Sequence, residues 1–318
     1  MNRRQLLGTL VAATAVAGLE TPLAWASRPR ASFAGRSFPG LQLYTVGAAL
    51  EEDFDGTLRQ VAAIGYRDVE LPAFYGKSAQ ALRQSLSRAG LSCLSAHVPQ
   101  VPWASGSLSL ATDLDGVLRY ADALRLRHIV CPMPVLLRPG QAMPAFTSPA
   151  QFAQALFGGA TREDWLRFAD FLNRTGERVT AAGFRFAYHN HNVDFRAFQG
   201  VRAYDLLLQH TEPALVDFEM DVGWICAGGG DPLEYLRRHP GRYRLMHIKD
   251  VKPDQRANTS LEIRATEAGK GRVDWPAVLE AAMAGGLEQG YVELDPPGDL
   301  PPLDSIRESY RYLSALAL

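Results

Sequence analysis

From residue 40 onward, short apolar runs alternate with longer amphipathic stretches, and this alternation constrains the fold more than any other feature of the sequence. Eight of the apolar runs have the length and composition of buried strands. They are Leu41–Thr45, Asp68–Leu71, Ser92–His97, His128–Cys131, Phe184–His189, Ala214–Glu219, Arg244–His247 and Gly290–Leu294. Strands that alternate with helices over about 280 residues predict a single-domain α/β fold, the closed (β/α)8 TIM barrel.

Glycines mark the predicted helix-to-strand connections, where a left-handed residue commonly ends a helix. They are Gly65, Gly90, Gly183 and Gly290. The competing fold is an open doubly wound sheet, but no GxGxxG follows the first strand to form its phosphate cradle. Two long connections, Met133–Glu163 and Val251–Trp275, follow strands four and seven. Because a TIM barrel carries its active site at this end of its strands, we expect both connections to cover the site.

The first 26 residues predict a cleaved export signal. Arg3-Arg4 precedes an uncharged run that ends at Leu19, and Ala24-Trp25-Ala26 supplies a small-x-small cleavage site. The arginine pair is typical of the twin-arginine route for folded proteins, and an ordinary signal peptide is the alternative. We therefore expect a periplasmic protein with no stable membrane anchor, a flexible lead-in at residues 27–39 and a catalytic barrel at residues 40–318.

Charge and cysteine content argue against several classes of protein. The 33 Lys and Arg residues and 34 Asp and Glu residues leave a net charge of -1, and no basic block indicates a nucleic-acid partner. Cys93, Cys131 and Cys226 show no CxxC spacing, which predicts buried free thiols rather than disulfides or a thiolate zinc site. The sequence leaves open whether the protein forms a homo-oligomer.

Imidazoles and carboxylates collect where the predicted strands end. Buried ionisable groups are costly unless they are paired or bind a metal, and the strand ends of a barrel converge. The pattern therefore predicts a divalent metal site with positions open to a substrate. The residues are Glu70 and His97 on strands two and three, His189 and His191 on strand five, Asp221 after strand six, His247, Lys249 and Asp250 on strand seven, and Glu293 on strand eight.

Seven motifs, in this order, resemble those of the xylose isomerase-like TIM barrels of sugar isomerases and epimerases. They are LQLYTV, GYRDVEL, AYHNH, MDVGWICAGGGDP, HIKD, EAGKGRVDW and YVELD, and they span residue 40 to about residue 312. The resemblance implies one divalent ion (Mn, Mg, Co or Zn). Matched residue by residue, its ligands fall on His189, Asp221, His247 and Glu293.

The chain departs from the family pattern on strand five. The family has Glu followed by Asn there, and this chain has His189-Asn190. An imidazole can bind a metal but cannot serve as an anionic base. His191 lies two residues further on, on the same face of an extended segment, so it is the alternative ligand to His189.

The resemblance implies a metal-dependent isomerase or epimerase that acts on a keto sugar or sugar derivative. The reaction removes a proton next to the carbonyl and passes through an enediolate. Glu293 is the expected ligand and base, with His191 or Glu70 on the opposite face and Lys249 beside the developing oxyanion. The residues expected to contact the substrate are Glu70, His97, Trp224 and Asp250.

Structural roles are the alternative explanation for these residues. His189 and His191 could form a hydrogen-bonded pair, Asp221 could cap a turn, and Trp224 could belong to the core instead of stacking on a sugar. His247, Lys249 and Asp250 could form an ion cluster at the rim of the barrel.

Other functions remain in competition with the isomerase hypothesis. The missing strand-five Glu favours a lyase or deglycosidase that cleaves 3-keto-glycosides by β-elimination. The family's zinc endonucleases have Asp-x-x-His where this chain has Asp221-x-x-Trp224, which argues against that activity. A non-catalytic sugar-binding barrel is the remaining alternative. Export and the lack of a phosphate-binding signature favour an unphosphorylated sugar or glycoside as the small-molecule partner.

Overall fold

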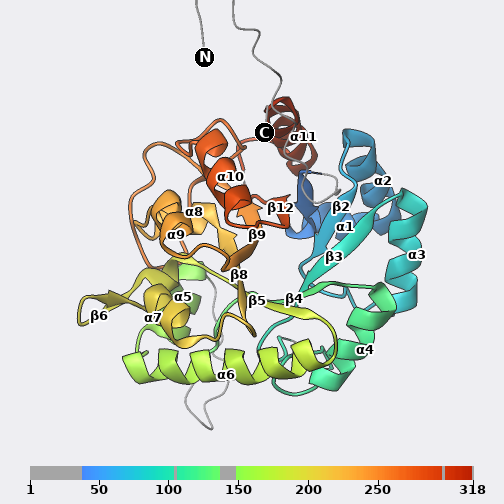
Figure 1. The fold of residues 1–318 in the computed structure, drawn as a ribbon. Coiled ribbons are helices and arrows are strands. Elements are labelled where there is room, and N and C mark those ends of the chain that lie inside the picture. The colour runs from blue at the N-terminus through green and yellow to red at the C-terminus, as the bar shows by residue number, and fades with distance from the viewer. Residues whose placement is uncertain (1–37, 104–105, 137–147, 296–297, 317–318) are drawn as a thin grey trace, which may run out of the picture. The chain divides into compact units, whose positions relative to one another are not determined.

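The computed structural model describes residues 38–103, 106–136, 148–295 and 298–316. Its parallel strands close into an eight-stranded barrel in the order β1-β12-β9-β8-β5-β4-β3-β2 (Figure 1), which confirms the predicted TIM barrel. The strands are β1 (Gly40–Gln42), β2 (Asp68–Leu71), β3 (Ser92–His97), β4 (His128–Cys131), β5 (Arg185–His189), β8 (Asp217–Asp221), β9 (Tyr243–Ile248) and β12 (Gln289–Val292). The predicted signal peptide and residues 27–37 of the lead-in lie outside the described residues.

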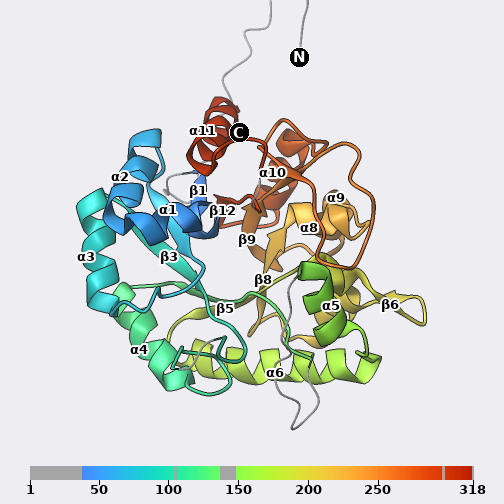
Figure 2. The same cartoon turned by 180° about the vertical axis from the view of Figure 1, so that it is seen from behind.

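Helices surround the barrel, as the two opposite views in Figures 1 and 2 show. They are α1 (Gly47–Glu52), α2 (Phe54–Ile64), α3 (Ala79–Ala89), α4 (Leu114–Leu124), α5 (Pro149–Phe157), α6 (Arg162–Ala181), α7 (Ala203–His210), α8 (Val222–Ala227), α9 (Pro232–Arg238), α10 (Trp275–Ala284) and α11 (Pro302–Ala315). Within the described ranges, none of them has the length and apolar character that crossing a bilayer requires.

Short 3-10 helices and two small antiparallel strand pairs lie in the connections between the barrel strands. Two turns of 3-10 helix, η1 (Leu43–Val46) and η2 (Asn192–Phe195), follow β1 and β5. One small antiparallel pair joins β6 (Ala197–Phe198) to β7 (Val201–Arg202), and another joins β10 (Asp250–Val251) to β11 (Ala265–Thr266). The second pair lies in the long connection after β9.

The first predicted strand is too long at its C-terminal end. β1 stops at Gln42, and the next four residues form η1 instead of continuing to Thr45. The Gln42 side-chain oxygen accepts a hydrogen bond from the Tyr44 amide at 3.2 Å and so caps this helix. A side chain that caps a helix competes with continued strand pairing, and the apolar pattern gave no sign of this.

Strands six and eight are displaced from their predicted positions. β8 begins at Asp217 rather than Ala214, because the amides of Leu215 and Val216 both bond to the Glu212 carbonyl in a turn. It then extends to Asp221, two residues beyond the predicted end. β12 begins one residue early and ends at Val292 rather than Leu294.

Three of the four predicted connection glycines have the expected conformation. Gly65, Gly90 and Gly183 have φ values of 134°, 71° and 90° and follow helices α2, α3 and α6. The prediction for Gly290 is wrong, because this residue lies inside β12. The left-handed glycine after α10 is Gly286, with φ 90°.

The barrel interior is arranged in layers along its axis. An apolar layer beneath the polar strand ends is fully buried and consists of Val130, Ala187, Leu245 and Tyr291. Because these side chains fill the barrel, the charged groups above them face only the C-terminal mouth. The three cysteines are buried and free, as predicted.

We expect Gly176→Ala to destabilise the fold. Gly176 lies within α6, and a Cβ there would approach the Leu215 carbonyl oxygen to 2.4 Å. Such overpacking costs about 1–3 kcal/mol, which exceeds the helix-propensity gain from alanine. Urea unfolding should therefore show a lower free energy of unfolding. The matched control is Gly47→Ala in α1, where a Cβ meets nothing within 4 Å. Equal stability of the two variants would contradict this packing.

Candidate metal and active site

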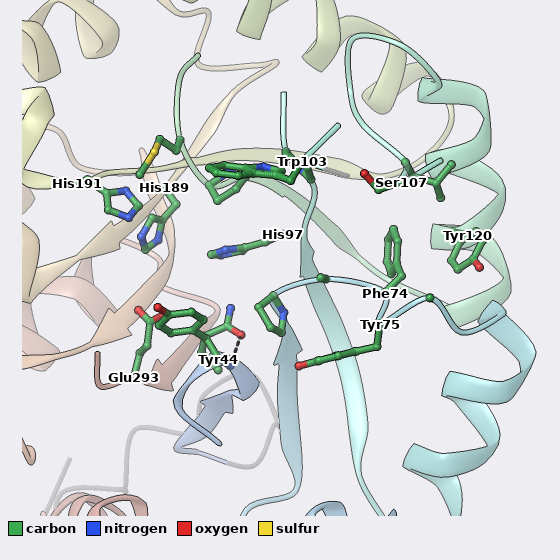
Figure 3. Close-up of a pocket in the computed structure, with 18 of the residues that line it drawn as sticks. Tyr44, Phe74, Tyr75, His97, Trp103, Ser107, Tyr120, His189, His191 and Glu293 are labelled. Carbon is green, nitrogen blue, oxygen red and sulfur yellow. Dashed lines mark hydrogen bonds between the residues drawn. The ribbon is translucent and has the colours of Figure 1, made fainter. Parts of the chain in front are cut away.

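The C-terminal strand ends open into a cavity of about 880 Å³. Figure 3 shows His189, His191 and Glu293 on one side of this cavity, His97 in the middle and a group of aromatic side chains on the other side. The polar end is lined by His97, His189, His191, Lys249, Glu293 and Asp295. The three residues predicted to be catalytic, Glu293, His191 and Lys249, therefore lie at one end of one cavity.

The structure brings the four predicted ligands together. One donor atom from each of His189, Asp221, His247 and Glu293 lies within 4.8 Å of the others, and all four residues are buried. Asp221 Oδ2 lies 3.9 Å from His189 Nε2 and 3.7 Å from His247 Nδ1. Glu293 Oε2 lies 2.7 Å from His247 Nδ1.

These donors fit a small divalent cation. Four ligands at about 2.0–2.2 Å from one ion lie about 3.3–3.6 Å apart in tetrahedral geometry, close to the observed separations. Asp221 Oδ2 is buried, and the Lys249 ammonium lies 3.1 Å from it. Burial and the nearby His247 lower the pKa of His189 well below its ordinary value, so this imidazole is neutral and has a lone pair for a metal.

Two buried carboxylates hold the ligand imidazoles from behind. Glu219 Oε2 lies 3.0 Å from His189 Nδ1, and Glu70 Oε2 lies 2.7 Å from His247 Nε2. We call His189, Asp221, His247 and Glu293 together the donor group. Each histidine directs one ring nitrogen to a carboxylate beneath it and the other nitrogen to the point where the four donor atoms meet. This is the carboxylate–histidine–metal arrangement that fixes the tautomer and orientation of metal-binding imidazoles.

Glu70 and Glu219 form a supporting layer beneath the donor group. Both carboxylate oxygens of Glu70 accept hydrogen bonds. Gln42 Nε2 donates to Glu70 at 2.8 Å, and the Ser95 hydroxyl donates to its other oxygen. His97 Nε2 lies 2.8 Å from Glu219 and 3.3 Å from Glu70, between the two carboxylates. Burial disfavours charge on His97, but Glu70 and Glu219 raise its pKa to about 9. The imidazolium therefore offsets the negative charge of the layer at neutral pH.

β-Bulges place both supporting carboxylates. The pairing register of β2 with β3 shifts between Val69 and Glu70, and that of β8 with β9 shifts between Phe218 and Glu219. A bulge re-aims the side chain beside it, and bulges concentrate next to active sites. Glu70 and Glu219 are both 0% exposed and reach the barrel axis at these two irregularities.

A second possible set of metal donors lies one layer deeper. It consists of His97, His189, Glu219 and His247. Its imidazole nitrogens are those that already pair with Glu219. The carboxylate of this set, Glu219, does not line the cavity, whereas Glu293 of the first set does, so only the first set has a carboxylate that a substrate can reach. The donor group that contains Asp221 and Glu293 is therefore the better catalytic site.

Lys249 is a fixed positive charge beside the donor group. Its Nζ lies 3.1 Å from Asp221, 2.9 Å from Glu293 and 2.7 Å from Asp295. Burial opposes this charge, but the three carboxylates raise the pKa of Lys249 well above its ordinary value. Burial raises the pKa of Glu293, but Lys249 and His247 lower it further, to well below the ordinary value. Both groups are therefore ionised.

Asp221 combines the two roles that the sequence left as alternatives. Its Oδ1 accepts a hydrogen bond from the Trp224 amide at 2.7 Å and caps α8. Its Oδ2 faces the donor group. Asn190 fixes the backbone here, because its side chain accepts from the Asp221 amide at 3.0 Å and donates to the Asp221 carbonyl at 3.2 Å.

His191 and Trp224 form part of the cavity wall. The two rings lie 5.2 Å apart, and the Lys249 ammonium lies 4.9 Å from the Trp224 ring. Trp224 is only 4% exposed, so it belongs to the core and to the wall together. His191 lies outside both donor groups, and its buried Nδ1 has no hydrogen-bond partner among the described residues. This placement makes His189 the strand-five donor.

Two predicted substrate contacts are corrected by the structure. Glu70 is 0% exposed and lies beneath the donor group, so it orients His247 instead of reaching the cavity. Asp250 also lies outside the cavity lining. Its carboxylate accepts hydrogen bonds from Gly269, Gly271, Val273 and the Trp275 indole. It therefore organises the connection after β9.

Both long connections contribute residues to the cavity walls. Met133 lines the main cavity. Residues 261–265 of the second connection line an adjoining cavity of about 520 Å³, which shares Tyr44, His191, Trp224 and Asp295 with the first. Residues 137–147 of the first connection lie outside the described residues.

The sequence matches the xylose isomerase-like TIM-barrel family over residues 58–316. The chain belongs to this family. An inosose dehydratase of Geobacillus thermodenitrificans (strain NG80-2) is 27% identical over 262 residues, which are 77% of this chain and 84% of that protein.

Solved structures show the same fold. A sugar phosphate isomerase/epimerase from Parabacteroides distasonis ATCC 8503 has a TM-score of 0.66 and 23% identity, covering 87% of this chain and 93% of that one. The IOLI protein, solved with a zinc atom, has a TM-score of 0.58 and 17% identity, covering 85% and 94%. At these identities the likeness establishes the fold alone.

Four residues at this site were not predicted from the sequence. Glu219 is the last residue of the predicted strand Ala214–Glu219, but the sequence pattern assigned it no role. Gln42, Ser95 and Asp295 also had no predicted role. Alternation would have indicated Glu219, because it precedes Asp221 by two residues and so shares its face. The aromatic residues of the connections after β2 and β3 gave no periodic signal.

Replacement of a proposed ligand should remove the metal. We expect Glu293→Gln and His247→Ala each to lower bound metal sharply, because each removes one of four donors. Metal content after equilibrium dialysis measures this, with circular dichroism to verify folding. His210→Ala, on the exposed end of α7, is the control and should bind metal as the unchanged protein does. Near-stoichiometric metal in either ligand variant would refute that assignment.

A supporting carboxylate should have a smaller effect than a ligand. We expect Glu219→Gln to weaken metal affinity about 10–100-fold, because the amide no longer orients His189 through a charged hydrogen bond. Chelator competition gives the affinity, and Glu234→Gln on the surface of α9 is the control. Unchanged affinity would show that Glu219 has no such role.

Proposed function

We propose that the protein is a divalent-metal-dependent lyase that eliminates a leaving group β to the ketone of a cyclic keto sugar or polyol. The observation that carries this proposal is the one-sided placement of the accessible carboxylates. Glu293 and Asp295, both at the end of β12, line the cavity, whereas Glu70 is sealed beneath the donor group.

Epimerisation requires a proton carrier on each face of the reacting carbon, and elimination can proceed with one. Glu70 was the anionic partner expected opposite Glu293, and its burial removes it from that role. The remaining partner is His191. Burial and the Lys249 charge lower the pKa of this imidazole to about 3, so it is neutral near pH 7 and has no imidazolium proton to deliver to the opposite face.

Each residue has a role in this proposal. Glu293 removes the proton next to the ketone, with its Oε2 held by His247 and Lys249. The electron pair forms a carbon–carbon double bond as the β carbon–oxygen bond breaks. The departing oxygen takes up the proton that Glu293 removed, so water or an alcohol leaves, Glu293 is ionised again and there is no redox change. The Lys249 ammonium stabilises the negative charge that develops on the ketone oxygen.

The ion is expected at His189, Asp221, His247 and Glu293. When bound there, it would supply Lewis-acid polarisation of the ketone. Two imidazoles and two carboxylates suit Zn, Mn or Co better than Mg. The zinc atom in the IOLI structure is consistent with this choice.

The sequence relatives favour the same class of reaction. Among the matching proteins, those from Geobacillus thermodenitrificans and others are named inosose dehydratases. Loss of water from a cyclic keto polyol is the reaction proposed here with hydroxide as the leaving group. We retain periplasmic export as part of the proposal, on the strength of the twin-arginine pattern.

Metal-loaded protein should eliminate from a keto substrate. We expect an inosose or methyl 3-keto-glucoside to lose water or methanol, as measured by mass spectrometry and by the ultraviolet absorption of the new enone. Chelation should abolish the reaction and added metal should restore it. Glu293→Gln should lower the rate by at least about 10²–10⁴-fold, because the base is lost together with one of the four metal donors.

The same experiment in deuterated water separates the two hypotheses. Epimerised product that carries solvent deuterium and keeps its leaving group would contradict the lyase proposal and support the isomerase. The His210→Ala variant, which retains the whole donor group, should match the unchanged protein.

A further inference from the structure

We infer that the preferred substrates are keto-glycosides whose leaving group is a flat aromatic alcohol, bound in an aromatic arm of the cavity. This inference rests on the proposed function and names its substrate class. The aromatic arm is the part of the cavity wall formed by Pro72–Lys77, Trp103, Gly106–Leu108 and Tyr120.

The aromatic arm extends sideways from the donor group. Its residues come mainly from the connections that follow β2 and β3. Figure 3 places Phe74, Tyr75, Ser107 and Tyr120 across His97 from His189 and Glu293, with Trp103 between. A ligand that spans the cavity would therefore have one end at the donor group and the other among aromatic rings.

Aromatic packing fixes the shape of the arm. The Phe74 and Tyr120 rings lie 4.7 Å apart at 35°, and Trp103 packs 5.6 Å from Phe152 of α5. The Tyr120 hydroxyl donates to the Lys77 carbonyl at 2.7 Å, which ties the connection after β2 to α4. The arm is therefore preformed rather than created by a ligand.

The backbone of the arm is held in a costly conformation. Tyr75 and Gly76 have φ values of 52° and 64°, and the Lys77 amide closes the turn on the Phe74 carbonyl at 2.9 Å. A bulky residue in the left-handed region is strained, and such strain collects at ligand-binding segments. The turn presents the Phe74 and Tyr75 rings to the cavity.

The exposure of aromatic side chains points to a ligand. Tyr44 and Trp103 are 47% and 48% exposed, and they are the most exposed large hydrophobic residues in the described part of the chain. Both line this cavity. A ligand that covers them would remove apolar surface from water, which is favourable.

The chemistry of the arm favours an aromatic group over a second sugar. Sugar hydroxyls need several hydrogen-bond partners, and the polar side chains of the arm are Tyr75, Lys77, Ser107 and Tyr120. Tyr120 already donates to a carbonyl, and the Lys77 ammonium lies 4.6 Å from the Phe54 ring. The Tyr75 hydroxyl is buried and not exposed to the cavity, so it offers a sugar hydroxyl no partner.

An aromatic alcohol also suits the proposed reaction. In a 3-keto-glycoside the C2 proton is next to the ketone and the glycosidic oxygen is on C1, the β carbon. Removal of the proton forms the C1–C2 double bond and breaks the bond from C1 to the aryl oxygen, which leaves as the phenol after protonation. A phenol has a pKa of about 10 and water about 15.7, so the aryl oxygen is the better leaving group.

The decisive experiment compares 4-nitrophenyl 3-keto-glucoside with methyl 3-keto-glucoside on the metal-loaded protein. We expect the ratio of kcat/KM values to favour the aryl substrate and to fall about tenfold in Trp103→Ala and in Phe74→Ala, mainly through KM. Trp103→Phe and Phe74→Tyr should restore most of the ratio. Glu262→Gln, in the adjoining cavity, is the matched control and should leave the ratio unchanged.

A binding measurement keeps the two proposals apart. Quenching of tryptophan fluorescence by the 4-nitrophenyl compound, weakened in Phe74→Ala, would support the arm even if no elimination occurs. Elimination from inosose or the methyl compound with no aryl preference would uphold the lyase and overturn the arm. A ratio that the arm variants leave unchanged would also overturn it.

Discussion

The geometry of this site depends on two buried carboxylate–imidazole pairs. They are Glu70 with His247 and Glu219 with His189. Removing a carboxylate from water costs several kcal/mol unless a partner offsets the loss. Here each carboxylate is offset by an imidazole that it also orients, and the His97 cation lies between them. Each imidazole consequently keeps one nitrogen aimed at the cavity. The geometry of the donor group therefore follows from the electrostatics of the layer beneath it.

Much of the barrel and the whole set of proposed ligands could be predicted from the sequence. β2, β3 and β4 match their predicted bounds, because short apolar runs between turn residues identify buried strands well. The donors could be named because the strand ends of a closed barrel converge. His189, Asp221, His247 and Glu293 are up to 104 residues apart in the chain (293 minus 189), yet one donor atom from each lies within 4.8 Å of the others.

The remaining features depend on details that a hydrophobic pattern does not contain. Alternation alone does not reveal the bulges beside Glu70 and Glu219, because a bulge alters the pairing register and leaves the composition unchanged. Asp250 has the same residue type and strand-end position as a ligand, and only its hydrogen bonds to the connection after β9 reveal its structural role. The aromatic arm lies in irregular connections, whose contacts have no sequence period.

The double use of Asp221 limits how this protein could be re-engineered. One oxygen begins α8 and the other faces the proposed ion, so the two properties share a single side chain. A longer glutamate could still reach a larger ion but would no longer cap the helix as a short side chain does. Any attempt to change the preferred metal at this position would therefore also disturb the start of a helix that is buried throughout.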